Sequence, residues 1–262
     1  MKTNYASRHF KLLFLSLFLA GIFLFPVVSC TVTNDVDPSN SQKGIVKGRV
    51  INSEGKAVAN AMIVANSTDY YNRTTTGYTN TDGYYQLELP TDIAAGSYYI
   101  EGSVMVRYHG KNYTMALYNE DTRVFSAYDG AVRNFVFRLT GKRSVDDDAM
   151  ASPLGGKLEV HHDFNTLERK NIEVTLQPEG PLVDGSTGKK IVAMLQENSY
   201  YVEDIPVGKY KITARDVVTQ EQLGISIMDS FKPYTSSVTG LFADDDFVGS
   251  THFRLAINIG KL

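Results

Sequence analysis

The chain has 262 residues, of which 43% are hydrophobic, 21% are charged and 11% are aromatic. Its 26 basic and 29 acidic residues give a formal charge of −3, so the basic surface typical of nucleic-acid-binding proteins is absent and no nucleic-acid partner is expected. The single cysteine excludes a disulfide within the chain.

The first thirty residues, "MKTNYASRHFKLLFLSLFLAGIFLFPVVSC", have the pattern of a secretory signal. Lys2, Arg8 and Lys11 precede an apolar run from Leu12 to Val28, and no acidic residue occurs before the cysteine. This order of charge and hydrophobicity predicts export.

The end of the signal, "VVSC", resembles the lipobox of bacterial lipoproteins. The resemblance implies that residues 1–29 are removed and that Cys30 is acylated, which would anchor the chain in a membrane with a mature charge of −6. An uncleaved signal anchor is the alternative, and Pro26 argues against it. Thr31, where an aspartate would indicate inner-membrane retention, points to the outer membrane and leaves the face open.

Residues 30–43 are polar and predict a flexible tether. From Gly44, apolar residues alternate with polar or small ones in "GIVKGRVINSEGKAVANAMIVA". This pattern predicts a hairpin with Val46 and Val50 on one strand and Met62 on the next. Turn signals then recur about every ten residues, a spacing typical of a β-sandwich.

This stretch, with "TNTDGYYQLELP" after it, resembles the carboxypeptidase-regulatory-like domain over residues 44 to about 141. The resemblance implies a transthyretin-like β-sandwich that is non-catalytic. The matching positions are Val46, Gly48, Val50, Gly55, Ala61, Ile63, Thr79, Gly83, Tyr85 and Leu87. Departures at turn or packing positions are Asn52, Ala57, Val58, Asn60 and Asn80.

The composition then changes to "TGKRSVDDDAMASPLGG", which predicts an interdomain linker, with one larger sandwich as the alternative. Strand-length runs follow to the end of the chain, and only "TDIAAG" or "TLERK" could form a helical turn. We therefore predict an all-β chain with two tandem immunoglobulin- or transthyretin-like sandwiches after a cleaved lipoprotein signal peptide. The predicted boundaries are 1–29 signal peptide, 30–43 tether, 44–141 first sandwich, 142–156 linker and 157–262 second sandwich.

One phrase occurs twice. In the first half a tyrosine pair leads to Pro90 and then to a glycine and Tyr98, and in the second half "YYVEDIPVGKYKITA" repeats this order around Pro206. Because proline cannot donate to a strand ladder, we read each copy as a strand that stops and returns, that is, a hairpin.

Few residues carry chemistry. The mature chain has four histidines and neither HExxH nor GxSxG. In "HHD", His161 and His162 point to opposite faces of a strand, so His161 with Asp163 supplies at best two ligands and no metal site is expected. "GSTGKK" at 185–190 lacks the hydroxyl residue of a phosphate-binding loop and predicts a hairpin turn. No catalytic residue and no cofactor are predicted.

Tyrosine is abundant, with 16 residues and no tryptophan. One interpretation is an aromatic core with cross-strand pairs; the other is a contact surface. Rings near the turns "DYYNR" and "RYHGKNY" are candidates for that surface, with Arg73 and Lys111 beside them. The predicted binding residues are Tyr70, Tyr71, Tyr108 and Tyr113.

The sequence thus predicts a non-catalytic lipoprotein of a Gram-negative cell envelope that acts as a binding or structural module. Its expected partners are the membrane, through the lipid anchor, and an envelope protein or a glycan. A glycan-binding accessory of a polysaccharide-uptake system and an accessory domain protein of a peptidase remain alternatives.

Overall fold

The computed structural model describes residues 40–69, 73–91, 96–146, 152–230, 232–244 and 253–262. Every regular element in these ranges is a β-strand except one 3-10 turn, η1 (Arg169–Asn171), which lies within and just after the predicted "TLERK" turn. The chain is therefore all-β, as predicted.

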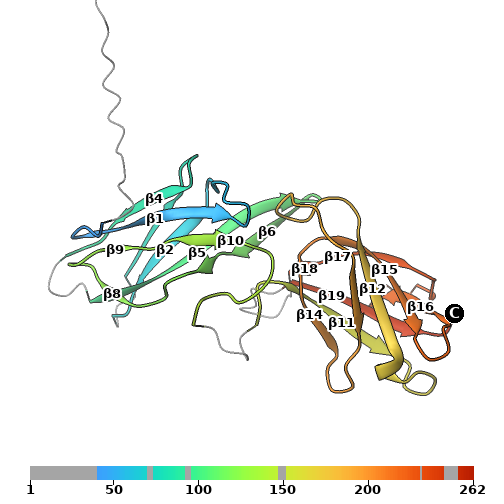
Figure 1. Cartoon of the computed structure of the whole chain (residues 1–262). Coiled ribbons are helices and arrows are strands. Elements are labelled where there is room, and N and C mark those ends of the chain that lie inside the picture. Colours follow the sequence, from blue (N-terminus) through green and yellow to red (C-terminus); the bar gives the residue numbers. More distant parts are fainter. Residues whose placement is uncertain (1–39, 70–72, 92–95, 147–151, 231, 245–252) are drawn as a thin grey trace, which may run out of the picture. The chain divides into compact units, whose positions relative to one another are not determined.

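Strands of the N-terminal half form two five-stranded sheets (Figure 1). One has the order β4-β1-β10-β7 with β9 beside β1, and the other has the order β3-β2-β5-β6 with β8 beside β5. The bounds are β1 Ile45–Asn52, β2 Met62–Ser67, β3 Thr74–Tyr78, β4 Tyr84–Glu88, β5 Ser97–Tyr108, β6 Lys111–Ala116, β7 Tyr118–Asn119, β8 Phe125–Ser126, β9 Ala131–Val132 and β10 Phe135–Phe137.

The C-terminal half forms one nine-stranded sheet in the order β13-β12-β15-β16-β19-β11-β14. β17 pairs with β15, and β18 pairs with β19. The bounds are β11 Gly156–His162, β12 Ile172–Pro178, β13 Ile191–Met194, β14 Tyr201–Ile205, β15 Lys209–Asp216, β16 Gln222–Ile227, β17 Val238–Leu241, β18 Ala243–Asp244 and β19 Phe253–Gly260.

Among the described strands, no sheet contains members of both halves, and the pairings in the two halves follow the same plan. β1 is antiparallel to β4 and parallel to β10, as β11 is antiparallel to β14 and parallel to β19. β2 lies between β3 and β5, as β12 lies between β13 and β15. The repeated phrase in the sequence therefore occupies the same place in each half.

The predicted hairpins at the phrase are wrong. β4 pairs with β1 while β5 pairs with β2, so the chain crosses from one sheet to the other between them. In the C-terminal half, β14 pairs with β11 and β15 pairs with β12, so these two strands are not neighbours either, although both belong to the nine-stranded sheet. The predicted hairpin of β1 and β2 fails for the same reason, because those strands also belong to different sheets. Alternation shows that a strand has one buried face but does not identify its partner.

The 185–190 turn does lie in a hairpin, as predicted. β12 and β13 are antiparallel neighbours, with Leu176 opposite Ile191. Inside their connection the Leu182 N–H donates to the Ser186 carbonyl at 2.9 Å, and Gly185 has a φ of 82°. Left-handed backbone at this position favours glycine.

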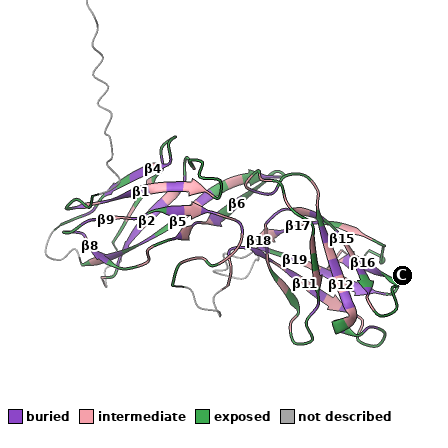
Figure 2. Cartoon of the chain, in the orientation of Figure 1, coloured by how far each residue is buried: buried purple, intermediate pink, exposed green. Residues whose placement is uncertain are grey.

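Burial alternates along the longer strands, so each presents one face to the core (Figure 2). The largest fully buried side chains include Tyr98, Phe135, Tyr210 and Phe242. Each such ring contributes about 1.5–3 kcal/mol relative to an exposed one. Aromatic residues thus form much of the core.

The segment predicted as a linker is tied to the chain at its described ends. The Asn119 N–H donates to the Arg143 carbonyl at 3.1 Å, and the Val145 N–H donates back to the Asn119 carbonyl at 3.2 Å. Leu154, within the predicted linker, is buried. Contacts group Val36–Leu262 as one compact unit, and the domain boundaries at 141 and 157 remain a prediction.

Candidate functional site

The predicted lipidation and binding residues fall into two groups. Cys30, Tyr70 and Tyr71 lie outside the described residues. Tyr108 and Tyr113 are described, and they are only 8% and 1% exposed. The expectation that these two rings stand in solvent at a hairpin tip is therefore wrong.

The tip itself forms as predicted. β5 ends at Tyr108 and β6 begins at Lys111, and the two residues between them, His109 and Gly110, have φ angles of 46° and 80°. Positive φ at both positions is typical of a two-residue type I′ turn. Lys111 and Arg73, expected to add polar contacts, are exposed.

Both buried tyrosines bond to the C-terminal half of the chain. The Tyr113 hydroxyl donates to the Phe242 carbonyl at 2.7 Å. The Tyr108 hydroxyl donates to the Pro181 carbonyl at 2.7 Å and accepts from the Lys209 N–H at 3.1 Å. Burial raises the pKa of Tyr113 to about 12, so its hydroxyl remains a donor at neutral pH. These side chains connect β5 and β6 to the C-terminal half.

Part of this burial could have been predicted from the sequence. The inward positions of β5 alternate, and Tyr108 has the same parity as Tyr98, Ile100 and Val104. The acceptor of Tyr113 lies 129 positions away, and no local pattern points to it.

Two further buried tyrosines have comparable structural roles. The Tyr85 hydroxyl donates to the Arg133 carbonyl at 2.7 Å, and the Tyr210 hydroxyl donates to the Pro206 carbonyl at 2.7 Å. Burial raises the pKa of both phenols. The interpretation of tyrosine as core material holds for these residues.

Asp204 binds both ends of the segment that joins the two halves. It lies in β14 with a φ of 59°, and its carboxylate accepts hydrogen bonds from the Gly141 N–H at 2.8 and 2.9 Å and from the Gly155 N–H at 3.2 Å. Aspartate tolerates this left-handed backbone better than most residues, and charge-assisted bonds of this kind are stronger than neutral ones. One side chain thus holds both ends of the stretch from Gly141 to Gly155.

The histidine pair points to opposite faces, as predicted. His162 is 8% exposed and lies 3.4 Å from Arg169, while the His161 ring is 2.7 Å from the Glu159 carboxylate. Burial, followed by the Arg169 charge, lowers the pKa of His162, which favours its neutral form. Within the described ranges, no group of three or more His, Cys, Asp or Glu side chains could hold a metal ion.

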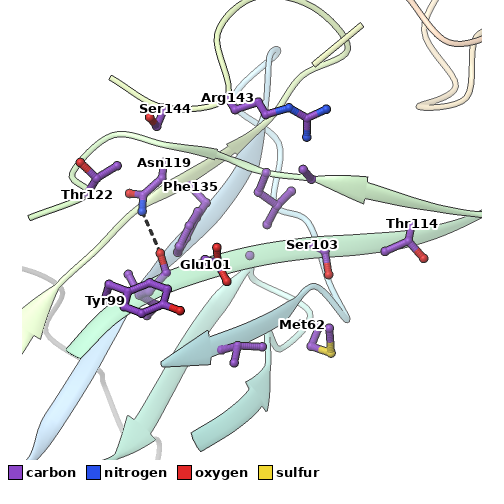
Figure 3. A pocket seen from close by; sticks show the side chains of 15 residues that line it. Met62, Tyr99, Glu101, Ser103, Thr114, Asn119, Thr122, Phe135, Arg143 and Ser144 are labelled. Carbon is purple, nitrogen blue, oxygen red and sulfur yellow. Dashed lines mark hydrogen bonds between the residues drawn. The ribbon is translucent and has the colours of Figure 1, made fainter. Parts of the chain in front are cut away.

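A cavity of about 580 Å³ lies beside the middle of β5 (Figure 3). Its floor is apolar and includes Phe135 and Leu117, which are buried. Figure 3 shows Thr122, Ser144 and Arg143 across the cavity from the strand that carries Tyr99 and Glu101. Such a combination of apolar floor and polar rim is typical of small-molecule sites.

Hydrogen bonds hold residues that line the cavity in place. Asn119 is buried, and its side-chain amide donates to the Ile100 carbonyl at 3.0 Å, the bond drawn in Figure 3. The Asn66 amide donates to the Glu101 carboxylate at 3.1 Å. Asn66 is only 9% exposed, so this buried side chain restricts the position of the Glu101 carboxylate.

No protein-family model matches the chain, and no curated protein matches it. Among solved structures it is similar to the Bacillus anthracis TIE protein, at 14% identity over 84% of this chain and 34% of that one, with a TM-score of 0.32. It is also similar to a streptococcal ancillary pilin, at 11% identity over 83% and 69% of the two chains with a TM-score of 0.27. A 9R-lipoxygenase from Cyanothece PCC8801 matches at 12% identity over 37% and 16%, with a TM-score of 0.21.

The chain thus spans about a third of the TIE protein and less of the lipoxygenase. Similarities at these identities and TM-scores carry no argument about function. The resemblance of residues 44–141 to the carboxypeptidase-regulatory-like domain stays a prediction. In the part of the chain that the structure describes, no helix has the length and apolar character needed to cross a bilayer.

Proposed function

We propose that this chain is a non-catalytic lipoprotein of a Gram-negative cell envelope that acts as a structural and binding module. The structural part rests on one observation: Tyr108 and Tyr113, the residues expected to bind a partner, instead bond to backbone groups of the C-terminal half. Side chains used in this way stabilise an arrangement of strands and are not available to a substrate.

Anchoring is supported by the sequence alone. The signal "VVSC" ends at the only cysteine, so acylation of Cys30 and removal of residues 1–29 would leave the described residues attached through a polar tether. Thr31 favours the outer membrane, and the proposal leaves its face open. The binding partner is an envelope protein or a glycan, since a mature charge of −6 disfavours nucleic acid.

Two tandem β-sandwiches, 44–141 and 157–262, complete the proposal. The absence of shared sheets and the repeated pairing plan support them. Tandem units with the same plan suit a spacer or a presenting module.

Membrane fractionation of cells expressing Cys30→Ser tests the anchor. The wild type should partition into detergent with the membrane fraction, and Cys30→Ser should be soluble or unprocessed. Thr31→Ser is the matched control, because it changes the neighbouring residue and retains the acylated cysteine; it should behave as the wild type does. Wild-type protein found wholly in the soluble fraction would end the lipoprotein proposal.

A further inference from the structure

We propose that the cavity beside β5 binds a neutral oligosaccharide, with Tyr99 as its stacking platform. This inference rests on the proposed function, because it gives the binding module a site and a ligand class. It moves the predicted contact surface away from Tyr108 and Tyr113 to a different tyrosine.

Tyr99 has the placement that a stacking platform needs. It lies on the outer face of β5, is 39% exposed and lines the cavity. Glu101 lies two residues further along the same face. Since a strand rises about 3.3 Å per residue, the Cα atoms of Tyr99 and Glu101 are about 7 Å apart. A sugar ring lying on the phenol would therefore bring its edge hydroxyls to this carboxylate. A flat apolar ring with a polar tip suits the C–H face and hydroxyl edge of a pyranose.

The polar rim matches hydroxyl groups better than an ion. Glu101 accepts hydrogen bonds, the Arg143 guanidinium donates them, and the hydroxyls of Ser103, Thr114 and Ser144 can do both. Vicinal sugar hydroxyls are donors and acceptors at once, so they can satisfy both kinds of partner. Among the described residues that line the cavity, the charged ones are Glu101 and Arg143, which have opposite signs, and this suits a neutral ligand better than an anion or a cation.

The site is also pre-organised. Asn66 holds the Glu101 carboxylate at 3.1 Å, and the Arg143 Nε–H donates to the Ser152 carbonyl at 3.0 Å. Groups fixed before binding lose less conformational entropy when the ligand arrives. Asn119, whose amide bonds to the Ile100 carbonyl, belongs to the wall and not to the contacts.

The size and shape of the cavity fit a short piece of a polymer. Its volume of about 580 Å³ lies in the range of ligand sites, and exposed residues, Tyr99 and Thr114 among them, border it. An opening to solvent lets a longer chain continue beyond the site. Met62, Val64 and Ala116 line the cavity and are partly exposed, so they supply apolar contact area without a charge.

The test is calorimetric titration of the detergent-purified full chain with soluble neutral hexasaccharides cut from α-glucan, β-glucan, mannan and xylan. At least one should bind, and Tyr99→Ala should weaken it about tenfold or more, as loss of an aromatic anchor does. Tyr99→Phe should keep most of the affinity, because stacking needs the ring and not its hydroxyl. Tyr128→Ala is the matched control, because it makes the same substitution at a tyrosine that is 61% exposed and lies outside the cavity. This variant should bind as the wild type does.

The outcomes separate the site from the wider proposal. Failure of all four sugars to bind at millimolar concentration, or equal binding by Tyr99→Ala and wild type, would overturn the oligosaccharide site and leave the anchored structural module standing. Thermal unfolding of Tyr99→Ala near the wild-type temperature excludes misfolding as the cause of weaker binding. If a bound sugar is recovered in shorter pieces, the site is supported and the non-catalytic proposal is wrong.

Discussion

Replacing Tyr113 tests whether its ring is structural. The side chain is 1% exposed, its hydroxyl donates to the Phe242 carbonyl at 2.7 Å, and its ring centroid lies 5.5 Å from that of Phe253. Tyr113→Phe removes only the hydroxyl and leaves the Phe242 carbonyl buried without its donor. Tyr113→Ala also removes the ring and leaves a cavity.

The two variants have different expected costs. A buried carbonyl that loses its donor lowers the free energy of unfolding by about 1–3 kcal/mol. Deletion of a buried aromatic ring lowers it by about 3–5 kcal/mol. The free energy of unfolding is therefore expected to decrease in the order wild type, Tyr113→Phe, Tyr113→Ala. In a chain of this size each kcal/mol that is lost lowers the melting temperature by about 2–4 °C.

Urea unfolding followed by circular dichroism measures these differences, since the chain has no tryptophan to report by fluorescence. Lys111→Ala is the control, because this residue follows the same turn and is exposed. Unfolding of both Tyr113 variants at the wild-type urea concentration would refute the buried arrangement and restore Tyr113 as a candidate contact residue.

Three further predictions concern charge, packing and organisation. The hydrogen bond from Arg123 lowers the pKa of Asp121 to about 2, so the stabilisation by the ionised carboxylate is present above pH 4 and is lost as the pH falls through 2. Asp121→Asn should therefore be less stable than the wild type at pH 7. Unfolding measured at decreasing pH should show the difference in stability between the two proteins disappear between pH 4 and 2. A Cβ at Gly48 would overlap the backbone carbonyl of Arg133, which lies between β9 and β10, so Gly48→Ala should cost about 1–3 kcal/mol in urea unfolding, and wild-type stability would contradict this packing. Limited proteolysis should cut between Gly141 and Gly156 and give two fragments that co-elute under native conditions, whereas one resistant core would mean a single domain.

Strand content could be predicted from the sequence because side-chain alternation is a local property. Alternating Val, Tyr and Ile predicted β1 and β5, and the His109-Gly110 turn forms where it was predicted, with positive φ at both residues. Sheet membership could not be predicted, because the same alternation fits a strand in either sheet of a sandwich. The repeated phrase was therefore recognised as a repeat and misread as a hairpin.

The candidate site was missed for a related reason. Tyr99 belongs to a tyrosine pair, Tyr98-Tyr99, of which one ring must face outward in a strand, and this is a usable signal. The opposite wall comes from Asn119, Thr122 and Arg143, which are 20 or more positions away and have no shared pattern. Turn composition drew attention to Tyr108 instead, and its burial depends on Pro181 and Lys209 of the other half.

Mass spectrometry of the N-terminal peptide, from protein extracted out of membranes, tests the lipid anchor. We predict a mature chain that begins at Cys30 and carries the added mass of acyl chains, with residues 1–29 absent. A chain that keeps those residues, or one that begins at Cys30 or later without added mass, would contradict a lipid-anchored module.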